Sequence, residues 1–259
     1  MWITISIIVT ILLVIGIIVG VVMSMSSSPK MTNIDFESLI HHYNVESFNE
    51  NKWQDLVTKT NAKITGELVK VSEEETDELD DFNFDDFETE SETKSEPKKL
   101  KLKTYLKGTT QTKIDLNMKI EEPNNWTMVF VTRYDPNGKA RARILQGKSN
   151  TLFGHWNNEV GTSFQRGWIH RGPRDNNTRW LLSIHQHQKI YNKLEDSDEW
   201  KVFEKSVQGV SENEPLYIND GGHTRELSDF NISEVRLYNK TLDDDEIEKV
   251  KKYFDEKYY

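Results

Sequence analysis

The amino-acid sequence predicts an all-β fold of two antiparallel sheets, with one helix at the C-terminal end and one transmembrane helix at the N-terminal end. Short stretches of the chain alternate apolar and polar residues, clusters of Gly, Pro and Asn separate these stretches, and an uninterrupted apolar run opens the sequence. Regularly spaced short strands with turns between them are typical of a β-sandwich rather than of an α/β fold.

The alternation is clearest at residues 112–120, where four apolar side chains are separated by polar ones. This period of two predicts a strand with one buried face. Residues 126–134 alternate again, and Asp135-Pro-Asn-Gly138 predicts a turn before a strand at 140–146. We expect further strands at 161–164, 167–170, 180–187, 200–207 and 216–218.

Residues 243–257 carry the one convincing helix pattern. Asp243 is placed to cap this helix, and Glu246 follows three residues later, as in a capping box. Leu242 and Ile247 have the spacing of a hydrophobic staple. The apolar stripe continues through Val250, Phe254 and Tyr258. We therefore expect the helix to lie on the sandwich.

Residues 1–25 are predicted to form a membrane anchor. The first twenty-nine residues contain no ionisable side chain, and crossing a bilayer core of roughly 30 Å takes about 20 apolar residues. A cleaved signal peptide is the alternative, but a basic start and a small-residue cleavage site are missing. Gly16 and Gly20 form a G-x-x-x-G pair, which fits either a homo-oligomer of packed helices or glycines that face lipid.

A Ser/Pro spacer at 26–33 leads from the anchor into a domain at 34–259. Lys30, Asp35 and Glu37 flank the anchor, and the positive-inside rule leans towards a C-terminal domain outside the cytosol. Four Asn-x-Ser/Thr sequons agree with that side, at Asn125, Asn176, Asn231 and Asn239. The predicted location is a membrane that the chain crosses once.

Most of the acidic charge is confined to an insertion at 72–97. Residues 73–96 hold thirteen acidic side chains and one lysine, so they carry −12 against a net charge of −10 for the whole chain. This density opposes burial and predicts a disordered insertion, although Phe82, Phe84 and Phe87 would also suit a docking motif for a basic partner. The remainder shows no broad basic face, which argues against nucleic-acid binding. The lack of cysteine excludes disulfides, cysteine-zinc sites and thiol catalysis.

Five segments carry a family resemblance: 51–66 (NKWQDLVTKTNAKITG), 150–156 (NTLFGHW), 167–170 (GWIH), 215–222 (PLYINDGG) and 228–254, which ends the domain. They resemble concanavalin A-like lectin/glucanase domains of the laminin-G-like type, with the acidic run as an insertion. The resemblance implies a two-sheet antiparallel jelly roll, a fold that hosts lectins, glycosidases and adhesion modules alike. Such a domain behind one anchor also resembles structural proteins of large DNA viruses of algae and protists.

We expect no catalytic residues. A retaining glycosidase needs two carboxylates about 5–5.5 Å apart, and the resemblance implies a Glu-x-Asp-x-Glu strand for that purpose. The triplet is absent, and the acidic cluster at 195–199 lies in loop-like sequence. The chain is therefore predicted not to be an enzyme.

Two sequence patterns would suit a metal ion, but neither identifies a complete set of ligands. His185-Gln-His187 places two imidazoles on one face of a strand, which zinc can use, but no third ligand is near and a polar strand face is the alternative. Asp135-Pro-Asn137 and Asn219-Asp220 offer loop oxygens for calcium, which laminin-G-like modules often hold, and both also suit turns. Calcium is thus a candidate cofactor, and no metal-binding residue is predicted.

One short stretch combines aromatic plates with hydrogen-bond donors, which is what sugar recognition requires. The predicted ligand-binding residues are His155, Trp156, Trp168, Arg171 and Arg174. The alternative for the tryptophans, Trp180 among them, is packing in the core or between the sheets.

These observations predict a single-pass membrane protein that binds or assembles. The leading hypothesis is a virion-membrane or minor capsid-associated protein, in a virion or host membrane, whose sandwich contacts other structural proteins or glycans. A cell-surface carbohydrate-binding lectin is the alternative, and a glycoside hydrolase is the third hypothesis. The expected partners are the lipid bilayer and structural proteins or glycans, with no nucleic acid.

Overall fold

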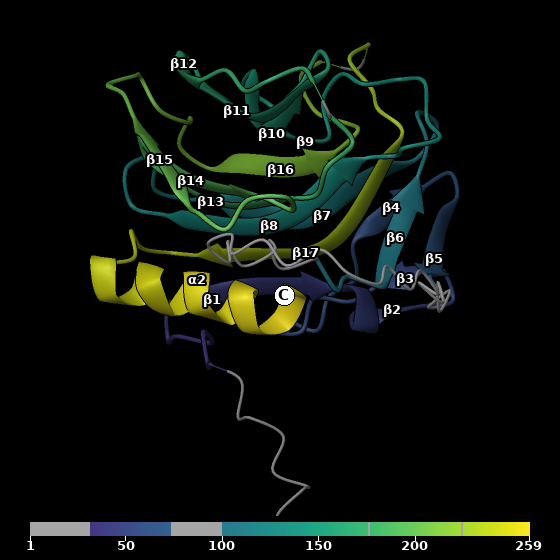
Figure 1. Ribbon diagram of the computed structural model, residues 1–259, viewed down its shortest axis with the longest axis horizontal. Coiled ribbons are helices and arrows are strands. Elements are labelled where there is room, and N and C mark those ends of the chain that lie inside the picture. Colours follow the sequence, from purple (N-terminus) through teal and green to yellow (C-terminus); the bar gives the residue numbers. More distant parts are fainter. Residues whose placement is uncertain (1–31, 74–99, 176, 224) are drawn as a thin grey trace, which may run out of the picture.

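The structure, a computed structural model, describes residues 32–73, 100–175, 177–223 and 225–259. The predicted anchor and nearly all of the predicted acidic insertion lie outside these residues. Among the described residues, no helix is both long and apolar enough to cross a bilayer. The chain forms two large antiparallel sheets, one above the other, and a helix beneath them (Figure 1).

The first sheet has eight strands in the order β15-β14-β13-β8-β17-β6-β5, with β1 also paired to β17. Its strands are β1 (Leu39–Asn44), β5 (Leu68–Ser72), β6 (Thr104–Gly108), β8 (Thr127–Tyr134), β13 (Leu181–Gln186), β14 (Lys189–Leu194), β15 (Lys201–Glu204) and β17 (Phe230–Tyr238). The second sheet has seven strands in the order β12-β11-β10-β9-β16-β7-β4. Its strands are β4 (Lys63–Thr65), β7 (Lys113–Ile120), β9 (Leu145–Gly147), β10 (Thr151–Trp156), β11 (Glu159–Gln165), β12 (Trp168–His170) and β16 (Glu214–Ile218).

A short 3₁₀ turn, η1 (Val45–Ser47), and a small hairpin of β2 (Phe48–Asn49) and β3 (Lys52–Trp53) complete the β structure. The predicted two-sheet antiparallel sandwich is confirmed, as is the helix that closes it, α2 (Asp244–Tyr258).

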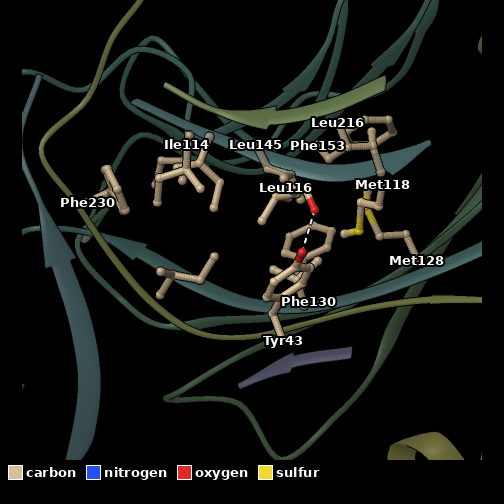
Figure 2. Packing of buried hydrophobic residues seen from close by; sticks show 14 of the residues in the cluster. Tyr43, Ile114, Leu116, Met118, Met128, Phe130, Leu145, Phe153, Leu216 and Phe230 are labelled. Carbon is tan, nitrogen blue, oxygen red and sulfur yellow. Dashed lines mark hydrogen bonds between the residues drawn. The ribbon is translucent and has the colours of Figure 1, made fainter. Parts of the chain in front are cut away.

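The main hydrophobic core lies between the two sheets (Figure 2). The alternating residues of β7 point into it and are buried, as the period of two predicted. They share this core with Phe130 of β8 in the opposite sheet and with Phe153 of β10 in their own sheet. The phenol of Tyr43 donates a 2.6 Å hydrogen bond to the carbonyl of Leu116, so β1 is fixed to the opposite sheet through the core.

The helix α2 packs on the outer face of the eight-stranded sheet and forms a second core there. Asp243 accepts a hydrogen bond from the amide of Glu246, and the Glu246 side chain accepts one in return, so the predicted capping box is confirmed. The apolar side of the helix is buried against β8 and β13. Its buried residues are Ile247, Val250, Tyr253, Phe254 and Tyr258.

The predicted strand at 140–146 is wrong over most of its length. Only its end belongs to β9, whereas residues 140–144 run as an irregular segment beside the loop that precedes β17. The amide of Asp229 donates to the carbonyl of Ala140, and the amide of Ala142 donates to the hydroxyl of Ser228. These backbone groups are therefore satisfied by a loop, which the local alternation could not indicate.

Candidate ligand-binding site

Trp156 and Trp168 lie together on the outer face of the seven-stranded sheet. His155 and Phe153 point into the core, and since neighbouring side chains of a strand face opposite ways, Trp156 points out. Trp168 of β12 pairs with Phe164 of β11, which also faces outward, and the two ring centroids are 4.9 Å apart. The centroids of Trp156 and Trp168 are 5.0 Å apart. Both indoles are partly exposed.

Arg171 covers both indole rings. Its guanidinium carbon lies 5.0 Å from the centroid of Trp156 and 5.1 Å from that of Trp168, within the range of cation–π attraction. The same guanidinium binds the buried carboxylate of Glu159 with two donors, through Nε at 3.1 Å and through Nη2. This bidentate ion pair holds the Arg171 guanidinium in a fixed position over the indoles. We call Trp156, Phe164, Trp168 and Arg171 the tryptophan cluster.

The loop after β12 lies tightly on β11. The amide of Gly172 donates to the hydroxyl of Thr162 at 3.0 Å, and the amide of Val160 donates to the carbonyl of Pro173 at 3.1 Å. A Cβ atom on Gly172 would lie 1.7 Å from the carbonyl oxygen of Val160, so only glycine permits this approach. The loop also brings Arg174 to 3.3 Å from Glu159.

A cleft of about 580 Å³ opens beside this loop, where the edges of the two sheets approach each other near β12 and β15. Pockets of this size hold small ligands. The imidazole of His170 stacks on Phe203 across the opening, with ring centroids 3.5 Å apart. Burial lowers the pKa of His170, so the ring is neutral at pH 7. Arg171, a member of the tryptophan cluster, also lines this cleft. Arg179 and Asp196 form an ion pair on the rim of the cleft.

Four of the five predicted ligand-binding residues meet at this surface, and His155 does not. His155 is fully buried, with its ring edge-on to Tyr134 in the core. The prediction was wrong because His155 and Trp156 are neighbours on one strand and therefore face opposite sides of the sheet. Trp180 is also buried, as the packing alternative predicted: it belongs to the second core and lies against Tyr105 and Arg133.

The predicted set missed Glu159, which organises the surface. Glu159 pairs with Trp156 across the β10–β11 hairpin, and its side chain is only 4% exposed. The sequence did contain a signal, because Glu159 and Asp175 are the only acids among three arginines at residues 150–175. A buried carboxylate is expected to have such a partner.

The residues of the two predicted metal patterns do not come together around a common site. His185 lies in the core, whereas β13 ends at Gln186 and His187 belongs to the following turn, so the two imidazoles do not share a strand face. The carboxylate of Asp135 lies 2.8 Å from Lys107 Nζ, and the Asn219 amide group binds backbone atoms of Thr109 and Ser228. Across the described parts of the chain, no three His, Cys, Asp or Glu side chains form a group suited to a metal. Calcium stays a prediction.

The acidic cluster at 195–199 lies between β14 and β15, in a loop as predicted. Glu195 accepts a hydrogen bond from the amide of Trp180, and Asp196 is paired with Arg179. These two carboxylates are therefore held by structural partners. The surface as a whole offers aromatic faces and fixed donors, a combination suited to binding.

No family model matches this chain, and no curated protein matches its sequence. Among solved structures, Domain 4 of AbnA, a GH43 extracellular arabinanase from Geobacillus stearothermophilus in complex with arabinotriose, superposes with a TM-score of 0.52 and 11% identity over 82% of this chain and 97% of that one. The binding domain of Paraclostridial Mosquitocidal Protein 1 superposes with a TM-score of 0.51 and 11% identity. The match covers 84% of this chain and 52% of that one. The likeness shows that this chain shares a β-sandwich fold with these two domains.

Proposed function

We propose that this β-sandwich is a carbohydrate-binding module and that the tryptophan cluster is its binding surface. The observation that carries the proposal is the position of Arg171, which the buried Glu159 holds across Trp156 and Trp168. Sugar rings stack on aromatic faces, and their hydroxyls need donors beside the stack. A rigid guanidinium beside two indoles supplies both without ordering a flexible side chain on binding. The arabinotriose bound to Domain 4 of AbnA is in keeping with a saccharide ligand on this fold.

Binding without catalysis is part of the proposal. Among the described residues, Glu159 supplies the one carboxylate bound to Arg171 and Arg174, and these arginines occupy its oxygens. A glycosidase would need a second carboxylate facing it across the sugar. Hydrolysis of an oligosaccharide that the protein binds, measured by release of reducing ends, would contradict this part.

A glycan array probed with the full-length chain in detergent tests the binding function. The expected result is selective binding that Trp168→Ala weakens at least tenfold, about 1.4 kcal/mol. Trp156→Ala is expected to act in the same direction. Val202→Ala, on an exposed apolar side chain of β15, is the control and should leave binding within twofold. The proposal fails if no glycan is bound, or if both tryptophan variants bind as the unmodified chain does while remaining folded.

If residues 1–25 tether the protein to a membrane, the tryptophan cluster lies on the side of the domain away from that tether. The first described residue, Thr32, donates a 2.6 Å hydrogen bond to Glu256 of α2. The helix α2 lies on the opposite side of the molecule from β10, β11 and β12 (Figure 1). A tether entering beside α2 would hold that side towards the bilayer and present the tryptophan cluster outward. Release of the chain from membranes by carbonate at high pH would contradict the tether.

Orientation can be tested with the sequons. Asn125 and Asn239 are exposed, whereas Asn231 is buried in β17. A domain outside the cytosol of a eukaryotic host would carry glycans at the first two, detectable as a mobility shift removed by endoglycosidase. The virion assignment derives from the sequence resemblance, and finding the chain in purified particles rather than in host membranes is its test.

A further inference from the structure

We infer that the tryptophan cluster selects glycans that carry an anionic group, a carboxylate or a sulfate ester, and that Arg174 binds this group. The inference rests on the proposed function, because it names the chemistry of the ligand at the same surface. Residues 150–175 carry three arginines and two acids, so this stretch has a net charge of +1.

The charges of this surface do not balance. The Glu159 side chain is 4% exposed, and it is the partner of both Arg171 and Arg174. One carboxylate neutralises one guanidinium, so the three groups together carry a net charge of +1. The positive groups lie outermost, with the Arg171 and Arg174 side chains 47% and 60% exposed. An approaching ligand therefore meets cations before it meets the carboxylate.

The donors are also unevenly used. Arg171 donates hydrogen bonds from its Nε and one Nη to Glu159, and its guanidinium lies over the indoles. Within the described parts of the chain, Arg174 donates a single hydrogen bond, 3.3 Å long, to an oxygen that Arg171 already occupies. A guanidinium has five N–H donors. The exposed edge of Arg174 thus has donors for a planar carboxylate or for two oxygens of a sulfate, which guanidinium groups bind in bidentate fashion.

A neutral sugar would use the indoles but would leave the excess charge without a counterpart. An acidic sugar uses both features of the surface, with its ring on Trp156 or Trp168 and its anionic group at Arg174. Carboxylate and sulfate share this chemistry, so the test separates them. Arg166, which is exposed in the turn between β11 and β12, is a further positive charge two residues before Trp168.

The test is a glycan array of matched oligosaccharides in neutral, uronic-acid and sulfated forms, probed with the full-length chain in detergent. Titration calorimetry then compares the best-bound acidic oligosaccharide with its neutral counterpart. We expect the acidic form to bind at least tenfold more tightly at 50 mM salt, with the preference reduced at 300 mM. Whichever acidic form binds better identifies the group.

Arg174→Ala is expected to weaken the acidic ligand at least tenfold and to change the neutral one less than twofold. Arg174→Lys keeps the charge but loses the bidentate geometry, so it should retain an intermediate affinity. Arg225→Ala is the matched control, because Arg225 is exposed and lies in the segment between β16 and β17. Its affinities should equal those of the unmodified chain.

Two outcomes overturn the inference while leaving the proposed function intact. Neutral glycans could bind at a site sensitive to Trp168→Ala without any preference for acidic forms, or Arg174→Ala could weaken both ligands equally. Binding of no glycan in any form would overturn the proposed function together with the inference.

Discussion

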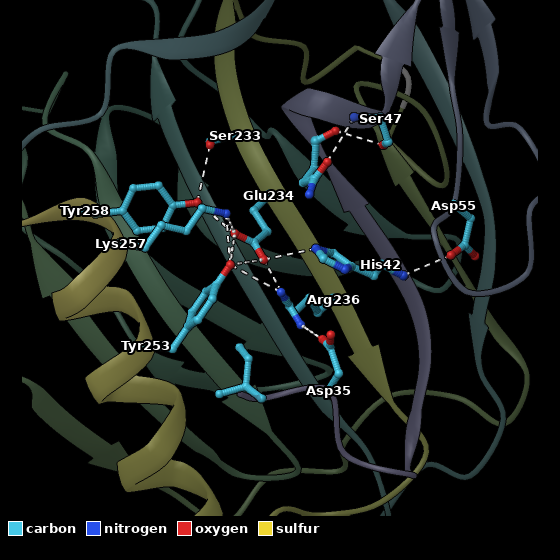
Figure 3. Close-up of polar contacts among 12 residues, drawn as sticks. Asp35, His42, Ser47, Asp55, Ser233, Glu234, Arg236, Tyr253, Lys257 and Tyr258 are labelled. Atoms are coloured by element: carbon cyan, nitrogen blue, oxygen red, sulfur yellow. Dashed lines mark hydrogen bonds and ion pairs between the residues drawn. The ribbon is translucent and has the colours of Figure 1, made fainter. Parts of the chain in front are cut away.

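The Nζ atom of Lys257 lies 2.6 Å from Oε2 of Glu234, and this ion pair joins the last turn of α2 to the middle of β17 (Figure 3). Tyr253 and Tyr258 of the same helix also donate hydrogen bonds to the Glu234 carboxylate. Burial alone would raise the pKa of Glu234, but Lys257, His42 and Arg236 hold it well below its usual range. One buried anion therefore organises most of the polar contacts between α2 and the sheet.

Glu234→Ala is expected to lower the free energy of unfolding by about 3–5 kcal/mol, because the partly buried Lys257 loses its anion and the buried Arg236 keeps only Asp35 among the described acidic residues. Urea unfolding followed by circular dichroism measures the loss. Lys252→Ala removes an exposed pair on α2 and should cost less than about 1 kcal/mol. Equal effects of the two substitutions would contradict the role given to Glu234.

Acid is expected to destabilise the fold through two core histidines. Burial lowers the pKa of His155 and of His185 to about 3. The unfolded chain keeps a histidine pKa of about 6.5, so below that pH only the unfolded state takes up these protons and stability falls as pH falls. Between pH 7.5 and pH 5 each histidine should cost about 2 kcal/mol.

Urea unfolding at pH 7.5 and pH 5 measures this loss for the unmodified chain and for His155→Gln and His185→Gln. Each substitution should remove a large part of the loss. Carboxylates contribute little in this window, because in the unfolded chain they titrate near pH 4. A double variant that retained the whole loss would show that other groups cause it.

Asp243→Ala is expected to destabilise the protein by about 1 kcal/mol, because the amide of Glu246 loses its capping acceptor. Thermal unfolding of the two proteins measures the difference. The comparison is Glu248→Ala, which removes only the pair between the exposed Glu248 side chain and Lys251 and should cost about 0.5 kcal/mol or less. The capping role is contradicted if Glu248→Ala is the more damaging substitution.

Gly172→Ala is expected to disrupt the tryptophan cluster, because its Cβ would collide with the carbonyl of Val160 and push the loop off β11. Glycan binding should fall at least tenfold, and acrylamide should quench tryptophan fluorescence more strongly as Arg171 leaves the indoles. Pro173→Ala keeps the carbonyl that Val160 binds and should leave both measurements unchanged. A Gly172→Ala protein with unaltered quenching would show that the loop does not position Arg171.

Local signals located many of the elements correctly. The alternation at β7 and the Asp243–Glu246 capping box needed only side chains a few residues apart. The same reasoning missed β14, whose side chains are covered on both faces and so do not alternate. It also extended a strand through 140–144, where the partner is a loop nearly ninety residues away.

The candidate site shows the same division. Aromatic and basic residues close together in sequence were enough to single out Trp156, Trp168, Arg171 and Arg174, since they lie on two adjacent hairpins of one sheet and in the loop that follows. The facing of His155 and the burial of Glu159 depended on which side of that sheet the second sheet covers.

Side-chain chemistry within a few residues was thus sufficient to predict the β-rich architecture, the capped C-terminal helix and the position of the candidate surface. The pairing of strands into sheets decided which face of each strand is buried and where the cleft between β12 and β15 opens. It also decided that Glu159 is the carboxylate that binds Arg171 and Arg174. These features join residues far apart in the chain, and a pattern read along one strand carries no information about the partner that covers it.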